Sequence, residues 1–200
     1  MVKQQRAART REALVQAAAT AFDCVGYEAA SLAQVSKSAG ISMGALTFHF
    51  PTKDQLAEAV QARGACVTRS AAEKITAEQG RPLRSAIDLT LEVARLLDED
   101  VAVRAAARLT RECPQAATPW TSVWLPAIEA LLCRASTDEL RPGADPQTVL
   151  TLTTHLITGT ESYIRRCATL PEQRESAQDQ LERVWRVVLP GISRNNAQLD

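Results

Sequence analysis

The sequence predicts an all-α protein of about nine helices, with a three-helix head of the helix-turn-helix type followed by a larger helical body. Three observations favour this class. Apolar residues recur at steps of three and four along most of the 200 residues, and no stretch shows the period of two that is typical of strands. Only 8 glycines interrupt a chain that is rich in Ala, Leu, Arg and Glu, a composition that favours helix.

The first two helices of the head are predicted from an apolar face and from caps. A first helix over Arg6–Val25 carries its apolar residues on one face, and Gly26 is expected to end it because glycine readily takes the left-handed conformation. Ser31 and Gln34 have the spacing of a capping box, which predicts a short helix over about residues 32–39. The apolar face of the first helix comprises Ala7, Leu14, Val15, Ala18, Ala21 and Phe22.

A third helix follows after a tight turn. Gly40 permits the left-handed backbone of such a turn, and Ser42 can cap a helix from Met43 to about Phe48. Pro51 then stops this helix, because the residue before a proline is pushed out of the α region. Two short helices joined by a glycine-containing turn are typical of a helix-turn-helix, although an αα-hairpin with no binding role has the same pattern.

The rest of the chain is expected to form longer helices separated by proline-rich and polar connectors. Thr52 and Gln55 repeat the capping-box spacing at the start of a helix that reaches towards Gln79. Asp145 is a suitable N-cap, and prolines at three of the expected helix starts suit a first turn. The expected later helices span Pro82–Glu99, Val101–Glu112, Trp120 to about Ala135, Pro146–Cys167 and Pro171–Ile192.

The charge of the chain is unevenly distributed. The formal net charge is zero, but residues 1–53 hold six basic against three acidic residues, so the remainder has an excess of three negative charges. A basic head on an acidic body suggests that the head meets a polyanion. The basic residues of the head are Lys3, Arg6, Arg9, Arg11, Lys37 and Lys53.

Targeting signals and cysteines favour a cytoplasmic protein that does not enter a membrane. The N-terminus lacks the apolar region of a signal peptide, and 18 uninterrupted apolar residues occur nowhere. The five cysteines are scattered and form no C-x-x-C pair, so we expect reduced, buried thiols, with a redox sensor as the alternative. They are Cys24, Cys66, Cys113, Cys133 and Cys167.

The head carries a motif that resembles the TetR family of transcriptional repressors. Thr10 and Arg11 stand near the start of the first helix, and residues 40–53 read GISMGALTFHFPTK, which matches G-x-[ST]-x-G-x-[LIV]-x-x-H-F-x-x-K. Between them lies an A-x-x-x-F-x-x-x-G-Y pattern made by Ala18, Phe22, Gly26 and Tyr27. The resemblance covers the whole N-terminal 60 residues, and it implies a DNA-binding domain over residues 1–53 and a ligand-binding and dimerisation domain over residues 54–200.

Three further features are similar to the γ-butyrolactone receptor branch of that family, found in antibiotic-producing actinomycetes. They are Phe48-His49-Phe50, the segment RLTRE at 108–112, and Trp124 in a proline-flanked helix. The resemblance implies a repressor that binds a palindromic operator in double-stranded DNA as a homodimer. A small effector, namely a γ-butyrolactone, a butenolide or an antibiotic-like molecule, would release it.

The third helix is expected to lie in the major groove. That groove is about 12 Å wide, so the face that enters it needs small or polar residues, while the other face anchors the helix. We expect Ala45, Leu46, Phe48 and Phe50 to be the anchor, with both phenylalanines in the core. The residues expected to contact DNA are Ser42, Met43, Gly44, Thr47, His49, Lys53 and Arg11.

Two of these positions depart from the receptor pattern. Relatives commonly carry Lys where this chain has Met43, and Tyr where it has Thr47. The missing lysine predicts a flatter salt dependence of DNA binding, by about one unit of slope. Arg11, with Arg6 and Arg9, could offset the loss by reaching the backbone or minor groove, although a solvated helix end is the alternative. The departures also support a second hypothesis, in which a TetR-fold protein with weakened operator binding acts through a protein partner.

The body offers apolar helix faces that suit either a core or a pocket for a mostly apolar ligand, and they include Ile87 and Leu91. From the receptor resemblance, Trp124 is the ligand-stacking indole and Thr158 the hydroxyl that bonds ligand carbonyls. Trp120 is expected at the pocket rim or in the core. Receptors often have a pocket-facing glutamine where this chain has Gly64, which points to a different ligand.

The last two predicted helices carry apolar stripes over Val149–Ile164 and Leu181–Val188, which resemble the family's dimerisation surface. Paired about a two-fold axis they would form a four-helix bundle. Two heads on two-fold symmetric DNA require half-sites about 34 Å, or a multiple of that, apart.

Neither catalysis nor a metal or other cofactor is expected. The chain has no G-x-S-x-G, no H-E-x-x-H and no Gly-rich phosphate loop. His49 and His155 are its two histidines, and they lie more than a hundred residues apart, with no cysteine or carboxylate at ligand spacing around His49.

Overall fold

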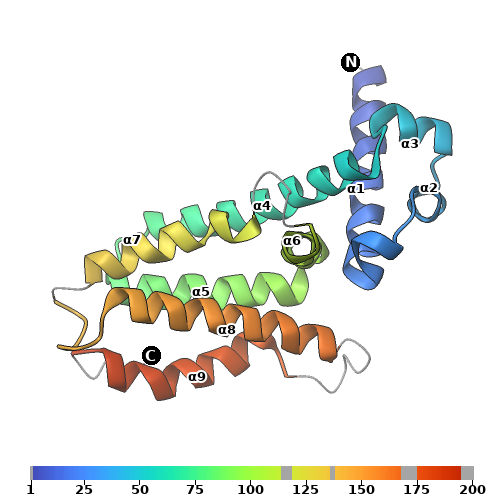
Figure 1. Ribbon diagram of the computed structural model, residues 1–200. Helices are drawn as coiled ribbons and strands as arrows, with labels where there is room; N and C mark the ends of the chain where they lie inside the picture. The colour runs from blue at the N-terminus through green and yellow to red at the C-terminus, as the bar shows by residue number, and fades with distance from the viewer. Residues whose placement is uncertain (1, 114–118, 136–137, 168–174, 195–200) are drawn as a thin grey trace. The chain divides into compact units, whose positions relative to one another are not determined.

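The computed structural model describes residues 2–113, 119–135, 138–167 and 175–194, and in these ranges the chain forms nine α-helices and one short 3-10 helix (Figure 1). An isolated bridge between Leu140 and Ser193 is the extent of β-structure in the described ranges. The predicted all-α class is therefore confirmed. The elements are α1 Val2–Ala29, α2 Leu32–Ala39, α3 Met43–His49, α4 Lys53–Ala77, α5 Pro82–Glu99, α6 Val101–Glu112, η1 Trp120–Val123, α7 Leu125–Ala135, α8 Pro146–Arg166 and α9 Ala177–Ile192.

Most predicted boundaries agree with these bounds. Helices α2, α5 and α6 span the predicted residues, and Asp145 caps α8 by accepting from the backbone N–H of Thr148 at 3.0 Å. Helix α1 begins four residues before the predicted Arg6. Its regular part ends where expected, because Gly26 takes a non-helical conformation with φ 83° and ψ 175°. The predicted start of the last helix at Pro171 lies outside the described residues, and α9 is described from Ala177.

One predicted helix is divided in two. We expected a continuous helix from Trp120 to about Ala135, but residues 120–123 form η1 and α7 begins at Leu125. Pro126 explains the break, since a proline inside an α-helix lacks the N–H that would bond to residue 122 and its ring clashes with that carbonyl. The 3-10 turn avoids both problems.

The contacts divide the chain into two compact units, which we describe separately. Unit 1 comprises residues 1–67 and 100–120, and unit 2 comprises residues 68–99 and 121–200. Unit 1 thus contains α1–α3, the first part of α4, and α6. The predicted boundary after residue 53 separates a DNA-binding domain from a ligand-binding and dimerisation domain. The division into contact units does not test it, so it stays a prediction.

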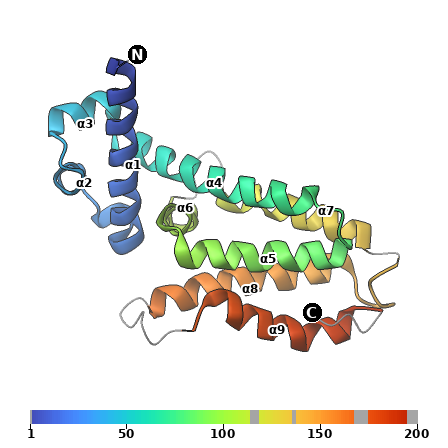
Figure 2. The ribbon, with the colours of Figure 1, turned by 180° about the vertical axis from the view of Figure 1, so that it is seen from behind.

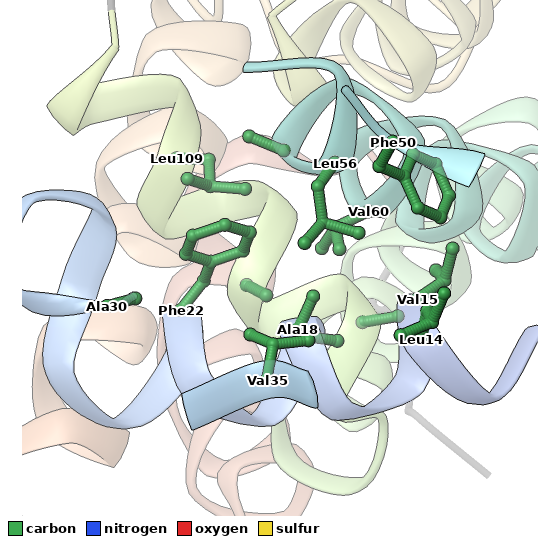
Figure 3. Packing of buried hydrophobic residues seen from close by; sticks show 14 of the residues in the cluster. Leu14, Val15, Ala18, Phe22, Ala30, Val35, Phe50, Leu56, Val60 and Leu109 are labelled. Carbon is green, nitrogen blue, oxygen red and sulfur yellow. The ribbon is translucent and has the colours of Figure 1, made fainter. Parts of the chain in front are cut away.

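The core of unit 1 collects apolar side chains from α1, α2, α3, α4 and α6. Figure 3 shows how these side chains pack. Phe22 of α1 and Leu109 of α6 are buried in it, and Leu46 brings α3 into the same cluster. A fully buried side chain of this size contributes about 2 kcal/mol through the hydrophobic effect, so this cluster is what fixes the helix-turn-helix to α1, α4 and α6. Its other labelled members are Leu14, Val15, Ala18, Ala30, Val35, Phe50, Leu56 and Val60.

Unit 2 is built around α5, which packs against α7, α8 and α9 (Figure 2). Eleven of its eighteen residues are buried, which suits a helix with neighbours on several sides. Two hydrogen bonds fix the connector before α8 to the end of α9. The Arg141 side chain donates to the carbonyl of Ser193 at 2.8 Å, and the Arg141 backbone N–H donates to the carbonyl of Ile192 at 2.9 Å. No helix in the described ranges is both long and apolar enough to cross a lipid bilayer.

Candidate functional site

The turn between α2 and α3 is fixed by local hydrogen bonds. The Ser31 hydroxyl oxygen accepts from the backbone N–H of Gln34 at 3.2 Å. In return, Gln34 Oε1 accepts from the backbone N–H of Ser31 at 3.0 Å, which completes the predicted capping box. Gly40 has φ 65° and ψ 27°, the left-handed conformation that the turn requires. The Ser36 hydroxyl donates to the carbonyl of Ile41, so the last turn of α2 holds the residue that leads into α3.

Helix α3 presents two different sides. Leu46 and Phe50 are buried in the unit 1 core, which confirms that they anchor the helix. Ser42 caps the helix by accepting from Ala45 N–H at 3.3 Å. The exposed residues of this segment are Ser42, Met43, Gly44, Thr47 and Phe48.

The prediction that Phe48 belongs to the core is wrong, because 82% of its surface is exposed. Successive residues of a helix are about 100° apart, so Phe48 lies about 200° from Leu46 and on the same side as Gly44, four residues earlier. The spacing of Leu46 and Phe50 already defined the buried side. Sequence reasoning grouped the two phenylalanines by residue type and overlooked this geometry.

Three further predicted DNA-contacting residues have identifiable surroundings. His49 is half-buried and meets the Phe48 ring edge-on, with centroids 5.4 Å apart. The Arg11 guanidinium lies 5.0 Å from the centre of the Phe50 ring, so it borders the end of α3. Lys53 Nζ donates to the carbonyl of Glu28 at 3.2 Å and lies 4.3 Å from the centre of the Tyr27 ring. Lys53 is therefore held by the end of α1, which makes it a less mobile cation than the sequence suggests.

The phenol of Tyr27 links the end of α1 to the start of α4 by donating to the Asp54 carboxylate. This hydrogen bond, together with burial, raises the pKa of Tyr27 to about 12, because the neutral phenol is the donor and a phenolate would face the carboxylate. Tyr27 was part of the family motif, and the structure supplies its role: it positions α4 and packs against Lys53.

A seam of charged hydrogen bonds joins α6 to the end of α1. Arg104 Nε contacts the Asp23 carboxylate at 2.7 Å, and Arg108 donates to the carbonyl of Asp23 at 2.7 Å. Glu112 accepts from the backbone N–H of Tyr27 at 2.7 Å. Burial opposes ionisation of Glu112, but bonds from Arg108 and from Tyr27 N–H outweigh it, so the pKa of Glu112 is lowered.

Two glycines of unit 1 occupy crowded positions. A Cβ on Gly26 would lie 2.5 Å from Arg108 Nη2, and one on Gly64 would lie 2.5 Å from the carbonyl oxygen of Ala102. Gly64 thus allows α4 and α6 to approach closely. The position at which receptors often carry a pocket glutamine is here a helix-packing residue.

Unit 1 also contains a cavity of about 300 Å³ between α1, α4 and α6. Polar and acidic side chains form much of its wall, and the buried Nε2 of Gln61 has no hydrogen-bond acceptor among the described residues. This lining does not suit the mostly apolar effector that the sequence predicts. The cavity is lined by Tyr27, Asp54, Ala57, Glu58, Gln61, Leu109 and Cys113.

The predicted ligand-binding residues fall into a buried and an exposed group. Trp124, Ile87 and Leu91 are buried and belong to unit 2, whereas the buried Trp120 belongs to unit 1, where its backbone N–H donates to Thr110 Oγ1 at 2.9 Å. Thr158 is exposed, and its hydroxyl donates to the carbonyl of Thr154 at 2.8 Å. The structure therefore does not bring Thr158 onto the buried face of α8.

Sequence reasoning missed the third tryptophan. Trp185 of α9 is almost completely buried in the chain, and its indole N–H has no acceptor among the described residues. A buried donor without a partner is uncommon, and it marks a position where a bound acceptor would be favourable. Trp185 follows Leu181 by four residues, so the helical period could have placed the two on one side of α9, but only the structure shows that the indole N–H lacks a partner.

The stripes predicted for dimerisation are largely used within one subunit. Val149, Ile157 and Ile164 of α8 are buried, as are Leu181 and Trp185 of α9. Val187, by contrast, is 80% exposed. The surface available for a second copy is thus narrower than the stripes suggested.

The cysteines correct another expectation. Cys24, Cys66 and Cys133 are exposed, and Cys113 and Cys167 are half-buried, so the predicted burial is wrong, while none of these five described cysteines forms a disulfide. Among the described residues, no cluster of three or more His, Cys, Asp or Glu side chains could hold a metal ion.

Comparison with known proteins identifies relatives of the head and of nearly the whole chain. Residues 14–60 match the family described as bacterial regulatory proteins, tetR family. The A-factor receptor protein of Streptomyces griseus is 30% identical over 196 residues, which cover 96% of this chain and 67% of that protein.

Solved structures show the same fold. A γ-butyrolactone receptor described as ArpA-like superposes with a TM-score of 0.78 at 24% identity, covering 94% of this chain and 90% of the other, a similarity that concerns the fold alone. The TetR family protein CprB from Streptomyces coelicolor, solved with its operator sequence, superposes with a TM-score of 0.74 at 26% identity, again covering 94% and 90%.

Proposed function

Because the chain belongs to the TetR family of bacterial regulatory proteins, in its γ-butyrolactone receptor-like branch, we propose that it binds a palindromic operator as a homodimer and represses transcription. A small signalling molecule, namely a γ-butyrolactone, a butenolide or an antibiotic-like compound, then releases it. The chain is a regulator and not an enzyme, and it would act in the cytoplasm, where bacterial DNA lies.

The observation that carries the DNA-binding proposal is the two-sided character of α3. Leu46 and Phe50 fix the helix to the core, and a capped turn sets its direction, while its other side is exposed. A recognition helix needs this combination of a rigid support and an open face. In this proposal Ser42, Met43, Gly44, Thr47 and His49 face the DNA, and Arg11 and Lys53 lie where they would meet the phosphates.

The division of roles follows the family. We propose that residues 1–53 contact DNA and residues 54–200 bind the effector and a second copy. Trp124 would stack on the effector, with Ile87 and Leu91 as apolar wall, and all three residues belong to unit 2. An effector releases DNA only to the extent that it binds the DNA-incompetent state more tightly, so its site must change when the heads change spacing.

A mobility-shift experiment tests DNA binding and its alternative together. Purified full-length protein is titrated onto the DNA upstream of its own gene at low salt. A retarded band that competes with unlabelled fragment supports the repressor, and gel filtration at the same concentration should give a dimer. If no fragment of that region is retarded, the regulator that acts through a protein partner is favoured instead.

Trp124→Ala tests the effector site. We expect this variant to keep operator binding and to lose release by a γ-butyrolactone with an alkyl side chain, or by culture extract. Removing a buried tryptophan costs about 3 to 5 kcal/mol of stability, so circular dichroism and operator affinity must first show that the variant is folded.

Trp124→Phe keeps a stacking ring and serves as the second variant, with partial release expected. If Trp124→Ala is folded and still lets go of DNA at the wild-type effector concentration, the assignment of Trp124 is wrong.

A further inference from the structure

We propose that the exposed face of α3 selects its half-site chiefly through thymine methyl groups, contacted by Phe48, Met43 and the methyl group of Thr47. This inference deepens the proposed operator binding and rests on it. It assigns Phe48, which the sequence had placed in the core, to the surface that reads the bases.

The hydrogen-bonding inventory of this face excludes the usual contacts to purines. Of the five exposed residues from Ser42 to Phe48, all within the described part of the chain, none carries a charge or a side-chain N–H. Guanine and adenine present N7 acceptors in the major groove, and their common partners are the N–H groups of Arg, Lys, Asn and Gln. None of these five exposed side chains offers such a group, and the N–H of the half-buried His49 is the nearest alternative.

The hydroxyl of Thr47 is also occupied. Thr47 Oγ1 donates to the carbonyls of Met43 and Gly44, at 3.1 and 3.2 Å, so its proton points back to the helix. What Thr47 offers to the groove is a methyl group and an acceptor. Ser42 accepts from Ala45 N–H and keeps its hydroxyl proton to donate. Among the five exposed side chains it is therefore the one that could donate a hydrogen bond to a base.

The apolar side chains of the face are correspondingly exposed. Phe48 is 82% and Met43 is 43% exposed, although burial of either would be favourable. Between them Gly44 has no atom within 4 Å of the place where a Cβ would be, so the backbone there can come close to base edges. The exposed apolar side chains of Met43 and Phe48 thus stand on either side of the open backbone at Gly44.

The base that fits this face is thymine, because its C5-methyl group is the apolar feature of the major groove. Burying one methyl group is worth about fourfold in affinity. His49 is half-buried and its ring packs against that of Phe48 in a T-shaped arrangement, so the most exposed part of the face is apolar. We therefore expect one or two thymines per half-site to carry the discrimination.

Deoxyuridine gives a direct test, because it pairs as thymine does and lacks only the methyl group. A duplex selected from randomised DNA with the wild-type protein is prepared with thymine, with deoxyuridine throughout, and with single replacements. The wild-type protein should bind the fully replaced duplex more weakly by about fourfold for each contacted methyl group. Single replacements should map the loss to one or two positions per half-site.

Phe48→Ala and Met43→Ala are the matched variants, and both side chains are exposed, so folding should be unaffected. Each should bind the thymine duplex more weakly and show a smaller difference between thymine and deoxyuridine. Arg11→Ala is the control, because a phosphate contact weakens binding to both duplexes equally.

The outcomes separate the inference from the function on which it rests. If the selection recovers no DNA and the upstream region is not retarded, the operator-binding proposal fails. If the thymine and deoxyuridine duplexes bind equally well, the operator-binding proposal stands and the thymine inference is wrong. A difference that persists unchanged in both alanine variants would also overturn the inference.

Discussion

Four glycines of unit 1 occupy two contrasting settings. Gly26 and Gly64 lie where helices meet, and a Cβ at either would come within 2.5 Å of an atom of α6. Gly40 and Gly44 flank the start of α3, and nothing lies within 4 Å of their Cβ positions. Gly26 and Gly64 thus lie in tightly packed contacts with α6, whereas Gly40 and Gly44 leave open space at the start of α3. We therefore expect substitutions in the first setting to change stability and substitutions in the second to change the proposed DNA binding.

The seam combines close packing with charge. Asp23 and Tyr27 of α1 are held by Arg104, Arg108 and Glu112 of α6 through bonds of 2.7 Å. Helix α3 has no comparable charged support among the described residues and depends on its caps and on Leu46 and Phe50. Substitutions should separate the two regions by their effects on unfolding and on DNA binding.

Gly26→Ala should have the largest effect. Its φ of 83° with ψ of 175° is a conformation that only glycine adopts easily, and the added Cβ would displace Arg108. We expect a loss of about 3 kcal/mol or more in the free energy of unfolding, measured by urea denaturation. A loss below about 1 kcal/mol would show that Arg108 and the backbone at residue 26 can move to accommodate the methyl group at little cost.

Gly64→Ala should follow. The backbone of Gly64 is helical, so the cost comes from the contact of the new Cβ with the Ala102 carbonyl and not from strain in φ. Overpacking of this kind costs about 2 kcal/mol. Thermal unfolding measures it, and Gly159→Ala is a suitable control, because that helical glycine of α8 has open space around it. Equal effects at the two positions would contradict the close approach of α4 and α6.

Tyr27→Phe should remove about 1 kcal/mol at neutral pH by deleting the bond to Asp54. Because the pKa of Tyr27 is raised in the folded state, its contribution is fully present below pH about 10 and is lost as the pH rises through about 12. The wild type should therefore lose stability over this interval more steeply than the variant. Tyr163→Phe, which changes the other tyrosine and keeps the Tyr27–Asp54 hydrogen bond, is the matched control.

Gly44→Ala should have the smallest effect on stability, and of opposite sign. Alanine favours a helix over glycine by up to about 1 kcal/mol, and here there is room for its methyl group. We expect a slightly higher melting temperature together with weaker operator binding in a mobility shift, because the added methyl group would stand between the backbone of α3 and the base edges. A stabilised variant with unchanged affinity would mean that the backbone at Gly44 does not approach the DNA.

Much of the fold could be predicted because its determinants are local. The capping box at Ser31 and Gln34, the left-handed Gly40 and the cap at Ser42 each act within four residues, so the helix-turn-helix followed from the sequence. The division of the helix at Trp120 was missed although Pro126 was visible, because the periodicity of the apolar residues was given more weight than the missing N–H.

The surroundings of the site residues depend on contacts between distant segments, and these were harder to predict. The engagement of Lys53 by Glu28 and Tyr27 requires α1 and α4 to meet. The crowding at Gly64 requires α6, which lies about forty residues later in the chain. The exposure of Phe48 was within reach of the helical period, and residue type alone was a poor guide to it.

The exposed cysteines offer an experimental use that follows from their placement. Cys24 lies in unit 1 beside the charged seam, and Cys133 lies in unit 2 on α7. With Cys66 replaced by serine, a donor and an acceptor dye on these two native thiols would form a fluorescent ruler between the units. Energy transfer between the two dyes, followed while an effector is added, would test whether the distance between the units changes as the proposed release of DNA requires.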